Sequence, residues 1–157
     1  MQIFLDMDGV ITDFVQYFID HYSIDPNPLP DEELWPKVHK IPGFWRTLPW
    51  MPDGKKLWDF VRQYEITILT SPSRSDERSK PEKLIWVRRE LGEVPVIFAR
   101  AGTKKDHLSV GDILIDDRLE NLRDLPKDVH GILHTSADTT INELTRIIGS
   151  KNEGSTF

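Results

Sequence analysis

The sequence FLDMDGVITDF, residues 4–14, joins a short apolar run to two aspartates separated by one residue. Its first residues have the pattern of a buried β-strand, and a glycine directly follows Asp8. Two carboxylates this close repel each other, and the repulsion costs stability unless a cation or a reaction makes use of them. We therefore take Asp6 and Asp8 as the first candidates for a functional site.

The composition is that of a globular protein with one hydrophobic core. The chain has 157 residues, of which 38% are hydrophobic and 29% are charged. It has no cysteine, which excludes disulfides, zinc–thiolate sites and thiol nucleophiles. The formal net charge is −6 and the basic residues form no long run, so we expect no long nucleic acid as a partner.

No stretch of the sequence is long and apolar enough to predict a bilayer span, so we expect no membrane partner. The first residues also lack the basic and apolar pattern of a secretory leader, because the first expected strand already starts at Gln2. We therefore expect a cytoplasmic protein. The sequence does not determine the oligomeric state and leaves a homodimer open.

Apolar runs and helical periodicity alternate along the chain. Runs bounded by polar turns predict strands at 2–6, 66–70, 94–98, 112–116 and 130–134. Amphipathic patterns predict helices at 53–63, 81–91 and 139–149, the second with Pro81 in its first turn and Gly92 after its end. This alternation predicts an α/β domain whose mostly parallel sheet is flanked by helices.

Residues 15–50 interrupt this alternation. The segment is rich in proline and contains the aromatic residues Tyr17, Phe18, Tyr22, Trp35, Phe44, Trp45 and Trp50. It is too long and too aromatic for a simple connection, so we predict a small helical and aromatic cap inserted after the first strand. The expected division is a core of residues 1–14 and 51–150, a cap of 15–50 and a flexible tail of 151–157. The alternative is that most of these aromatics only pack the insert against the core.

Polar side chains follow several of the expected strands. Those at the strand ends are Asp6, Asp8, Thr70, Ser71, Asp116 and Asp117. Because the carboxyl ends of parallel strands meet at one edge of a sheet, we expect these residues to converge. Oxygen ligands without cysteine or histidine favour Mg²⁺, and hydroxyls with a lysine can bind a phosphate. One carboxylate could then attack phosphorus while another acts as acid and base.

Each of these motifs also has a plain structural interpretation. The DxDG sequence occurs in calcium-binding loops, but this one lacks the glycine and glutamate that such a loop needs at its sixth and twelfth positions. The pair Asp116–Asp117 could form a turn with an ion pair to Arg118. Lys83 taken alone is typical of a solvated helix, and Asp13 could be a helix N-cap. We interpret all five histidines as structural or surface residues.

The motifs DMDGV, ILTS, a downstream lysine and LIDD, in this order, resemble the four motifs of the haloacid dehalogenase-like phosphohydrolases. The sequences DMDGVITDF, GFW..LPWMPDG, TSPS, PEKLIWV and ILIDDR are similar to those of the 5′(3′)-deoxyribonucleotidases in that superfamily, over about residues 2–118. This resemblance implies a Rossmann-like core with a cap. It also implies a Mg²⁺-dependent phosphatase that hydrolyses (deoxy)ribonucleoside monophosphates through an aspartyl phosphate.

The resemblance assigns chemical roles to five residues of this chain. It implies that Asp6 is the nucleophile and that Asp8 is the general acid and base, with the Asp8 main-chain carbonyl on Mg²⁺. Lys83 would neutralise the phosphate and Asp6. Asp6 and Asp117 would bind the metal directly, and Asp116 would support them.

The resemblance also implies a substrate-binding set. It assigns the phosphate to Thr70 and Ser71, and it places Phe14, Phe44 and Trp45 near the nucleobase, where aromatic rings can stack.

Further basic residues would lie near the phosphate and the ribose. They are Arg74, Arg100 and one of Lys104 or Lys105, between which the sequence does not choose. Trp35 is a further candidate for stacking on the base.

Two other functions remain open at this point. The first is a phosphatase of the same superfamily that acts on another small ester, such as a sugar phosphate. The second is a catalytically silent module that binds nucleotides or regulates a partner.

Overall fold

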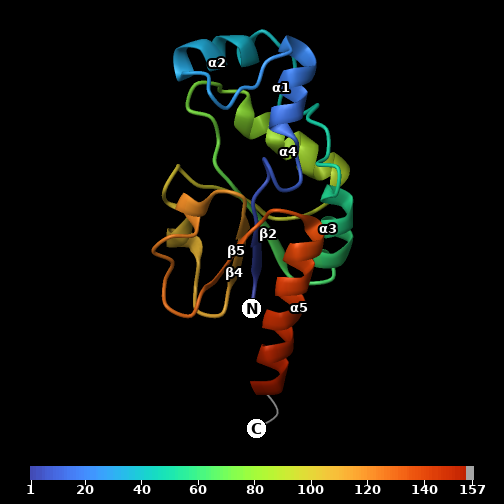
Figure 1. Ribbon diagram of the computed structural model, residues 1–157, viewed down its shortest axis with the longest axis vertical. Helices are drawn as coiled ribbons and strands as arrows, with labels where there is room; N and C mark the ends of the chain where they lie inside the picture. Colours follow the sequence, from blue (N-terminus) through green and yellow to red (C-terminus); the bar gives the residue numbers. More distant parts are fainter. Residues whose placement is uncertain (155–157) are drawn as a thin grey trace.

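The computed structural model of the chain describes residues 1–154, and it is an α/β structure with a central five-stranded sheet (Figure 1). The strands are β1 (Ile3–Leu5), β2 (Ile66–Thr70), β3 (Val96–Phe98), β4 (Ile113–Asp116) and β5 (His130–Leu133). They lie in the order β3-β2-β1-β4-β5, and every neighbouring pair is parallel. The predicted mostly parallel sheet is therefore confirmed, with each strand close to its expected position.

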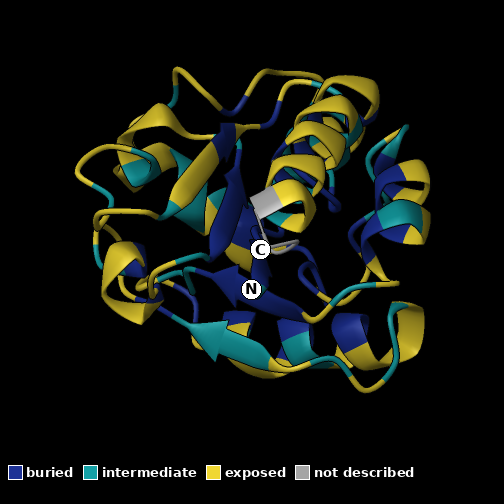
Figure 2. Ribbon diagram, turned by 90° about the horizontal axis from the view of Figure 1, so that it is seen from below, coloured by how far each residue is buried: buried dark blue, intermediate teal, exposed yellow. Residues whose placement is uncertain are grey.

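The sheet is covered on both faces, which explains why its central strands are almost continuously apolar. One face carries α3 (Gly54–Val61), α4 (Ser79–Glu90) and α5 (Ala137–Gly154), whose apolar side chains pack with Ile3 and Leu5. The other face presents Phe4, which packs with residues of β2 and β4 and with Ala99 and Leu108 from the connecting segments. Alternate residues of β1 thus enter two hydrophobic clusters, and Figure 2 shows the buried strands at the centre.

A second helical layer lies beyond the carboxyl edge of the sheet. It consists of α1 (Phe14–Tyr22) and α2 (Asp31–His39), which lie together at the top of Figure 1. Asp13 is the N-cap of α1, since its carboxylate accepts a hydrogen bond of 3.1 Å from the Gln16 backbone N–H. We refer to α1, α2 and the return segment of residues 40–53 as the cap.

The two chain crossings between the sheet and the cap run side by side. The Met51 N–H donates to the Ile11 carbonyl at 2.7 Å, and the Asp13 N–H donates to the Pro49 carbonyl at 2.9 Å. An isolated antiparallel bridge also pairs Thr12 with Trp50. Backbone hydrogen bonds therefore fasten the entry and the exit of the cap to each other.

Helix boundaries differ from the sequence expectations in two places. The helix α4 starts at Ser79, so that Pro81 is its third residue, and α5 runs from Ala137 to Gly154. Residues 151–154 of the expected tail lie in the last turn of α5. Residues 155–157 of that expected tail lie outside the described part of the chain.

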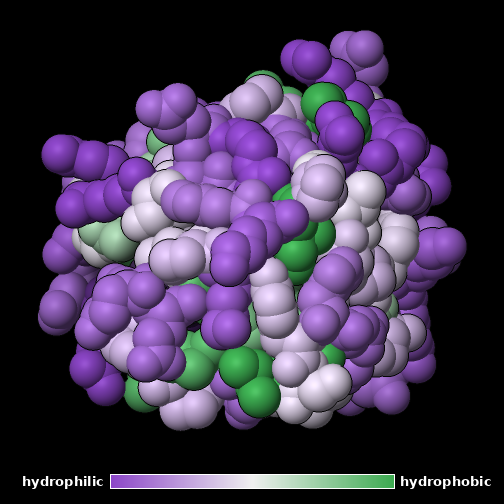
Figure 3. Space-filling model, turned by 90° about the horizontal axis from the view of Figure 1, so that it is seen from above, coloured by the Kyte–Doolittle hydropathy of each residue, from purple (hydrophilic) through white to green (hydrophobic). Residues whose placement is uncertain are grey.

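No helix within residues 1–154 is long and apolar enough to cross a membrane. Seen from the cap end, the surface is mainly hydrophilic, with small separate hydrophobic areas (Figure 3).

Candidate active site

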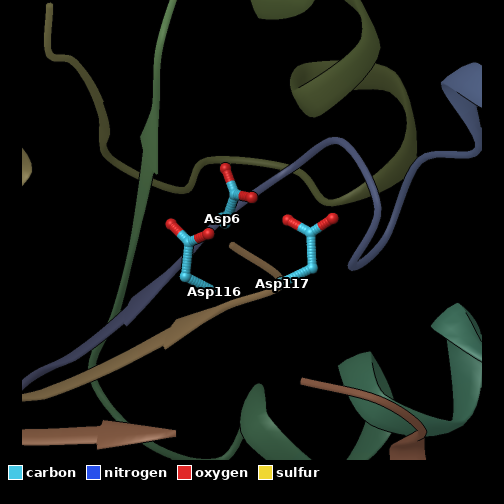
Figure 4. Close-up of side chains that lie close together, drawn as sticks. All are labelled: Asp6, Asp116 and Asp117. Carbon is cyan, nitrogen blue, oxygen red and sulfur yellow. The ribbon is translucent and has the colours of Figure 1, made fainter. Parts of the chain in front are cut away.

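Three carboxylates meet at the carboxyl edge of the sheet. Asp6 follows β1, and Asp116 and Asp117 lie at the end of β4, which is the parallel neighbour of β1. One oxygen of each residue lies within 4.8 Å of the others, and the side chains point into the same space (Figure 4). Parallel pairing therefore brings together acids that are more than a hundred residues apart in the sequence.

A buried lysine holds two of these acids together. The Lys104 Nζ lies 2.8 Å from Asp6 Oδ1 and 2.8 Å from Asp116 Oδ2, and Lys104 is only 3% exposed. Lys105 is exposed, so the structure resolves the choice between these two lysines in favour of Lys104. The attraction is strong here because little water screens the buried charges.

Burial and like charge work against the ionised cluster. Burial raises the pKa of the Asp6 carboxyl well above its ordinary value, and the charge of Asp116 adds to this effect while Lys104 opposes it. Burial likewise raises the pKa of Asp117, with Asp116 again contributing. The cluster thus favours any arrangement that brings further positive charge to it.

Asp116 and Asp117 have different hydrogen-bonding partners. Asp116 Oδ1 accepts from the Arg118 N–H at 2.9 Å, and Asp116 Oδ2 accepts from Asn121 Nδ2 at 3.1 Å as well as from Lys104. Asp117 Oδ1 is buried and has no hydrogen-bond partner within residues 1–154. A buried oxygen without a partner is costly, so this atom is free to bind a ligand such as a cation.

The second aspartate of the DxD pair has its own lysine. The Lys83 Nζ lies 3.0 Å from Asp8 Oδ2, 3.0 Å from Thr70 Oγ1 and 3.0 Å from the Ser71 carbonyl. Thr12 Oγ1 also donates to Asp8 Oδ1 at 2.8 Å. These contacts fix the Asp8 carboxylate while leaving 30% of its side chain exposed.

Each aspartate of the DxD pair therefore forms an ion pair with a different lysine. Lys83 was expected to neutralise Asp6, but the structure pairs it with Asp8, and Lys104 takes the position against Asp6. Lys83 reaches Asp8 because it lies in the first half of α4, next to Thr70 at the end of β2. Sequence spacing gave no means to determine which carboxylate each lysine would reach.

A pocket of about 880 Å³ connects this cluster with the cap. The walls at the sheet edge include Asp6, Asp8, Thr70, Ser71, Lys104 and Asp117. The walls on the cap side include Phe14, Pro26, Leu29, Leu34, Trp35 and Trp45. The pocket is thus polar and charged at one end and largely apolar and aromatic at the other.

Some expected substrate residues lie elsewhere. Phe44 is fully buried and is not part of the pocket wall among the residues described; its ring packs against Phe14 at 5.2 Å and Trp45 at 5.2 Å between centroids. Arg74 lines the pocket, whereas Arg100 is exposed and does not. The sequence could not predict which of Phe44 and Trp45 lines the pocket. These residues lie in an irregular segment, where no regular periodicity determines the direction of each side chain.

Two further pocket residues were not assigned to the site from the sequence. His134 is buried at the pocket wall, where its Nδ1 lies 2.7 Å from Thr140 Oγ1 and its backbone N–H donates to the Asp116 carbonyl at 2.8 Å. Burial lowers the pKa of this imidazole. Asn121 also lines the pocket and supports Asp116. The position of His134 directly after β5 was the signal that could have placed it at this edge.

Comparison with a solved structure supports the class of the fold. The D,D-heptose 1,7-bisphosphate phosphatase from Burkholderia thailandensis aligns with a TM-score of 0.51 and 12% sequence identity, covering 91% of this chain and 97% of that one. At this identity the similarity concerns the fold alone. The two proteins share a fold, and in this chain the carboxyl edge of the parallel sheet carries Asp6, Asp116 and Asp117.

Sequence relatives then identify the family. A "Putative 5′(3′)-deoxyribonucleotidase" of Bordetella bronchiseptica is 33% identical over 142 residues, covering 75% of this chain and 74% of that protein. The protein of the same name from Bordetella pertussis is 32% identical over 142 residues, with the same coverage. The family model "5′ nucleotidase, deoxy (Pyrimidine), cytosolic type C protein" matches residues 22–149. The chain belongs to this nucleotidase family and is a phosphoric monoester hydrolase.

The close approach of Gly9 to Asp117 makes a testable prediction. Gly9 has a φ of +86°, and a Cβ there would lie 2.0 Å from Asp117 Oδ2. Gly92 has a φ of +89° with nothing within 4 Å of its Cβ position, so Gly92→Ala measures backbone strain alone. We expect Gly92→Ala to lower the free energy of unfolding by about 1 kcal/mol, and Gly9→Ala by clearly more. Urea denaturation of both variants is the measurement, and equal losses would contradict the prediction.

Proposed function

We propose that this nucleotidase is a Mg²⁺-dependent enzyme that hydrolyses deoxyribonucleoside monophosphates through an aspartyl phosphate on Asp6. The observation that carries the proposal is that the same pocket has carboxylates and lysines at one end and aromatic rings at the other. A nucleoside monophosphate has the matching division into a charged phosphate and a flat base. The name of the matched family, which includes the words deoxy and pyrimidine, supports the same substrate class.

Asp6 is the proposed nucleophile. Its carboxylate is at the pocket wall and its side chain is 10% exposed, so the environment is dry but open to a substrate. Lys104 holds Asp6 Oδ1 in place by an ion pair of 2.8 Å. Attack of an Asp6 oxygen on phosphorus forms the aspartyl phosphate and breaks the bond to the ester oxygen of the nucleoside.

Asp8 is the proposed general acid and base. In the first step it gives its proton to the departing ester oxygen, and in the second it takes a proton from a water molecule that attacks the phosphorus. Phosphate then leaves and the Asp6 carboxylate is restored. The contacts of Asp8 with Thr12 and Lys83 support this role, because they fix the carboxylate at the pocket wall.

The acid cluster suits a hard divalent cation. Its donors are all oxygens, and the unpartnered Asp117 Oδ1 is an atom that a cation would satisfy. We assign Mg²⁺ to Asp6, the Asp8 main-chain carbonyl and Asp117, with Asp116 in support because hydrogen bonds already occupy its oxygens. When bound, Mg²⁺ would supply the positive charge that lets a phosphate approach these acids.

The remaining pocket residues are assigned to substrate binding. Thr70 and Ser71 lie beside the acids and are proposed to bind the phosphate, with Arg74 at the wall nearby. Phe14 and Trp45 are proposed to contact the base, while Phe44 supports them from behind. We also propose a cytoplasmic location, which the word cytosolic in the family's name supports.

The role of Asp6 can be tested by substitution. We expect Asp6→Asn to lower kcat for dUMP or TMP by at least about 10³-fold, because the amide cannot form the acyl phosphate. The matched control is Asp59→Asn, an exposed acid on α3 that should leave hydrolysis unchanged. Near-normal phosphate release by Asp6→Asn would show that the nucleophile is another group.

Metal removal tests the cofactor. We expect a chelator to abolish hydrolysis and added Mg²⁺ to restore it, because the acids repel the phosphate without a cation. We also expect Mg²⁺ to raise the melting temperature of the wild type but not of Asp117→Asn, since only the wild type has the buried ligand oxygens intact. Full activity after chelation and dialysis would contradict the proposal.

A panel of phosphate esters separates the proposed function from its alternatives. We expect kcat/KM to be higher for deoxyribonucleoside monophosphates than for sugar phosphates, because only a nucleotide has a base to place at the aromatic end of the pocket. Higher values for sugar phosphates would favour the other small-ester phosphatase. Nucleotide binding without phosphate release from any ester would favour the catalytically silent module.

A further inference from the structure

The indole N–H of Trp45 makes a buried hydrogen bond to a carboxylate, which its position in the pocket wall does not require. The residue is 2% exposed and lies in the return segment of the cap. Its indole Nε1 donates to Asp76 Oδ2 at 2.9 Å. Lys83 Nζ lies 5.1 Å from the centroid of its ring, so this indole stands between the aromatic end of the pocket and the lysine that binds Asp8.

Asp76 is a buried charge with a complete set of donors. It is 4% exposed and lies in the loop between β2 and α4, which belongs to the core. Besides Trp45, it accepts hydrogen bonds from Arg78 Nε at 3.0 Å, Arg78 Nη2 at 2.8 Å and the Arg78 backbone N–H at 3.1 Å. Although burial acts to raise the pKa of Asp76, these donors lower it to about 2, so the carboxylate stays charged.

Arg78 extends this contact to the end of α2. Its Nη1 donates to the Ile41 carbonyl at 2.9 Å, and its Nη2 donates to the Val38 carbonyl at 3.2 Å. Val38 is in the last turn of α2, and Ile41 follows the C-cap of that helix. One guanidinium thus joins the core loop to the helix that supplies Trp35 to the pocket.

A hydrophobic contact would suffice to attach the cap, and burying a carboxylate costs free energy that packing does not. The charged group adds a directional hydrogen bond, which hydrophobic packing does not provide. A carboxylate fixed by a bidentate arginine leaves one defined position for the indole N–H, and therefore one orientation of the Trp45 ring. The aromatic wall of the pocket is thus set relative to Lys83 and the acids rather than merely held near them.

We propose that Asp76, held by Arg78, is a positioning residue that orients Trp45 and thereby sets the preference of the site for nucleotides over phosphate esters without a base. This inference rests on the proposed function. It assigns a selectivity role to two residues that do not touch the phosphate end of the pocket. The role belongs to the loop between β2 and α4 and not to the cap alone.

The test compares two substrates across a double-mutant cycle. The variants are Asp76→Asn, Trp45→Phe and the double variant, and the substrates are dUMP and 2-deoxyribose 5-phosphate. We expect each single variant to raise KM for dUMP about tenfold, with a much smaller change in kcat/KM for the sugar phosphate. We expect the double variant to be no worse than Trp45→Phe, because Asp76→Asn weakens the hydrogen bond that Trp45→Phe removes.

Glu82→Gln is the matched control. Glu82 is a buried carboxylate 3.9 Å from Arg78 Nε, and its oxygens have no hydrogen-bond partner among the described residues. It shares the arginine but makes no hydrogen bond with Trp45, so we expect it to change thermal stability without changing the ratio of the two kcat/KM values. If Asp76→Asn does not fold, Trp45→Phe still removes the indole donor while keeping the Asp76–Arg78 pair.

Two results would overturn the inference. Equal losses for both substrates would mean that Asp76 only stabilises the fold, and additive losses in the double variant would mean that Trp45→Phe acts through ring size alone. The wild-type enzyme distinguishes this failure from that of the proposed function. If the wild type does not release phosphate from dUMP, the proposed function fails and the inference with it; if it does, the variants decide the inference alone.

Discussion

The site depends on one ammonium group placed between two carboxylates. Lys104 Nζ is 2.8 Å from oxygens of both Asp6 and Asp116, at the ends of adjacent parallel strands. Parallel pairing forces these acids together, and burial raises the pKa of Asp6 because water cannot screen them. The lysine offsets only part of this repulsion, and Asp117 Oδ1 still has no partner within residues 1–154. The uncompensated negative charge favours a further positive charge at this edge of the sheet.

A second ammonium group, that of Lys83, contacts the other aspartate of the DxD pair. Lys83 contacts Asp8, Thr70 and the Ser71 carbonyl, so the two aspartates of the DxD pair sit in different electrostatic surroundings. Asp6 is nearly buried, whereas Asp8 remains 30% exposed at the pocket. Such a difference suits one carboxylate to attack and the other to exchange protons. The neighbouring residues thus place two chemically identical side chains in different electrostatic environments.

Much of this architecture could be predicted from the sequence, because parallel strands obey a simple rule. The apolar runs located all five strands, and their shared carboxyl edge brought Asp6, Asp116 and Asp117 together. The partners of the lysines could not be predicted, since Lys104 lies in a 3-10 turn after an irregular loop where spacing carries no facing information. The Asp76–Trp45 contact was equally hidden, because both residues lie outside regular elements and are 31 positions apart.

The paired crossings at Ile11–Asp13 and Pro49–Met51 have a mechanical consequence. The cap is joined to the core by two segments that are hydrogen-bonded to each other. Such a connection allows the cap to rotate about the axis of these two segments more readily than it allows the cap to slide along the core. Opening of the pocket for substrate entry or product release would then be a rotation of the cap about these two segments. Such a rotation would have to break the hydrogen bonds from the Arg78 guanidinium to the Ile41 and Val38 carbonyls.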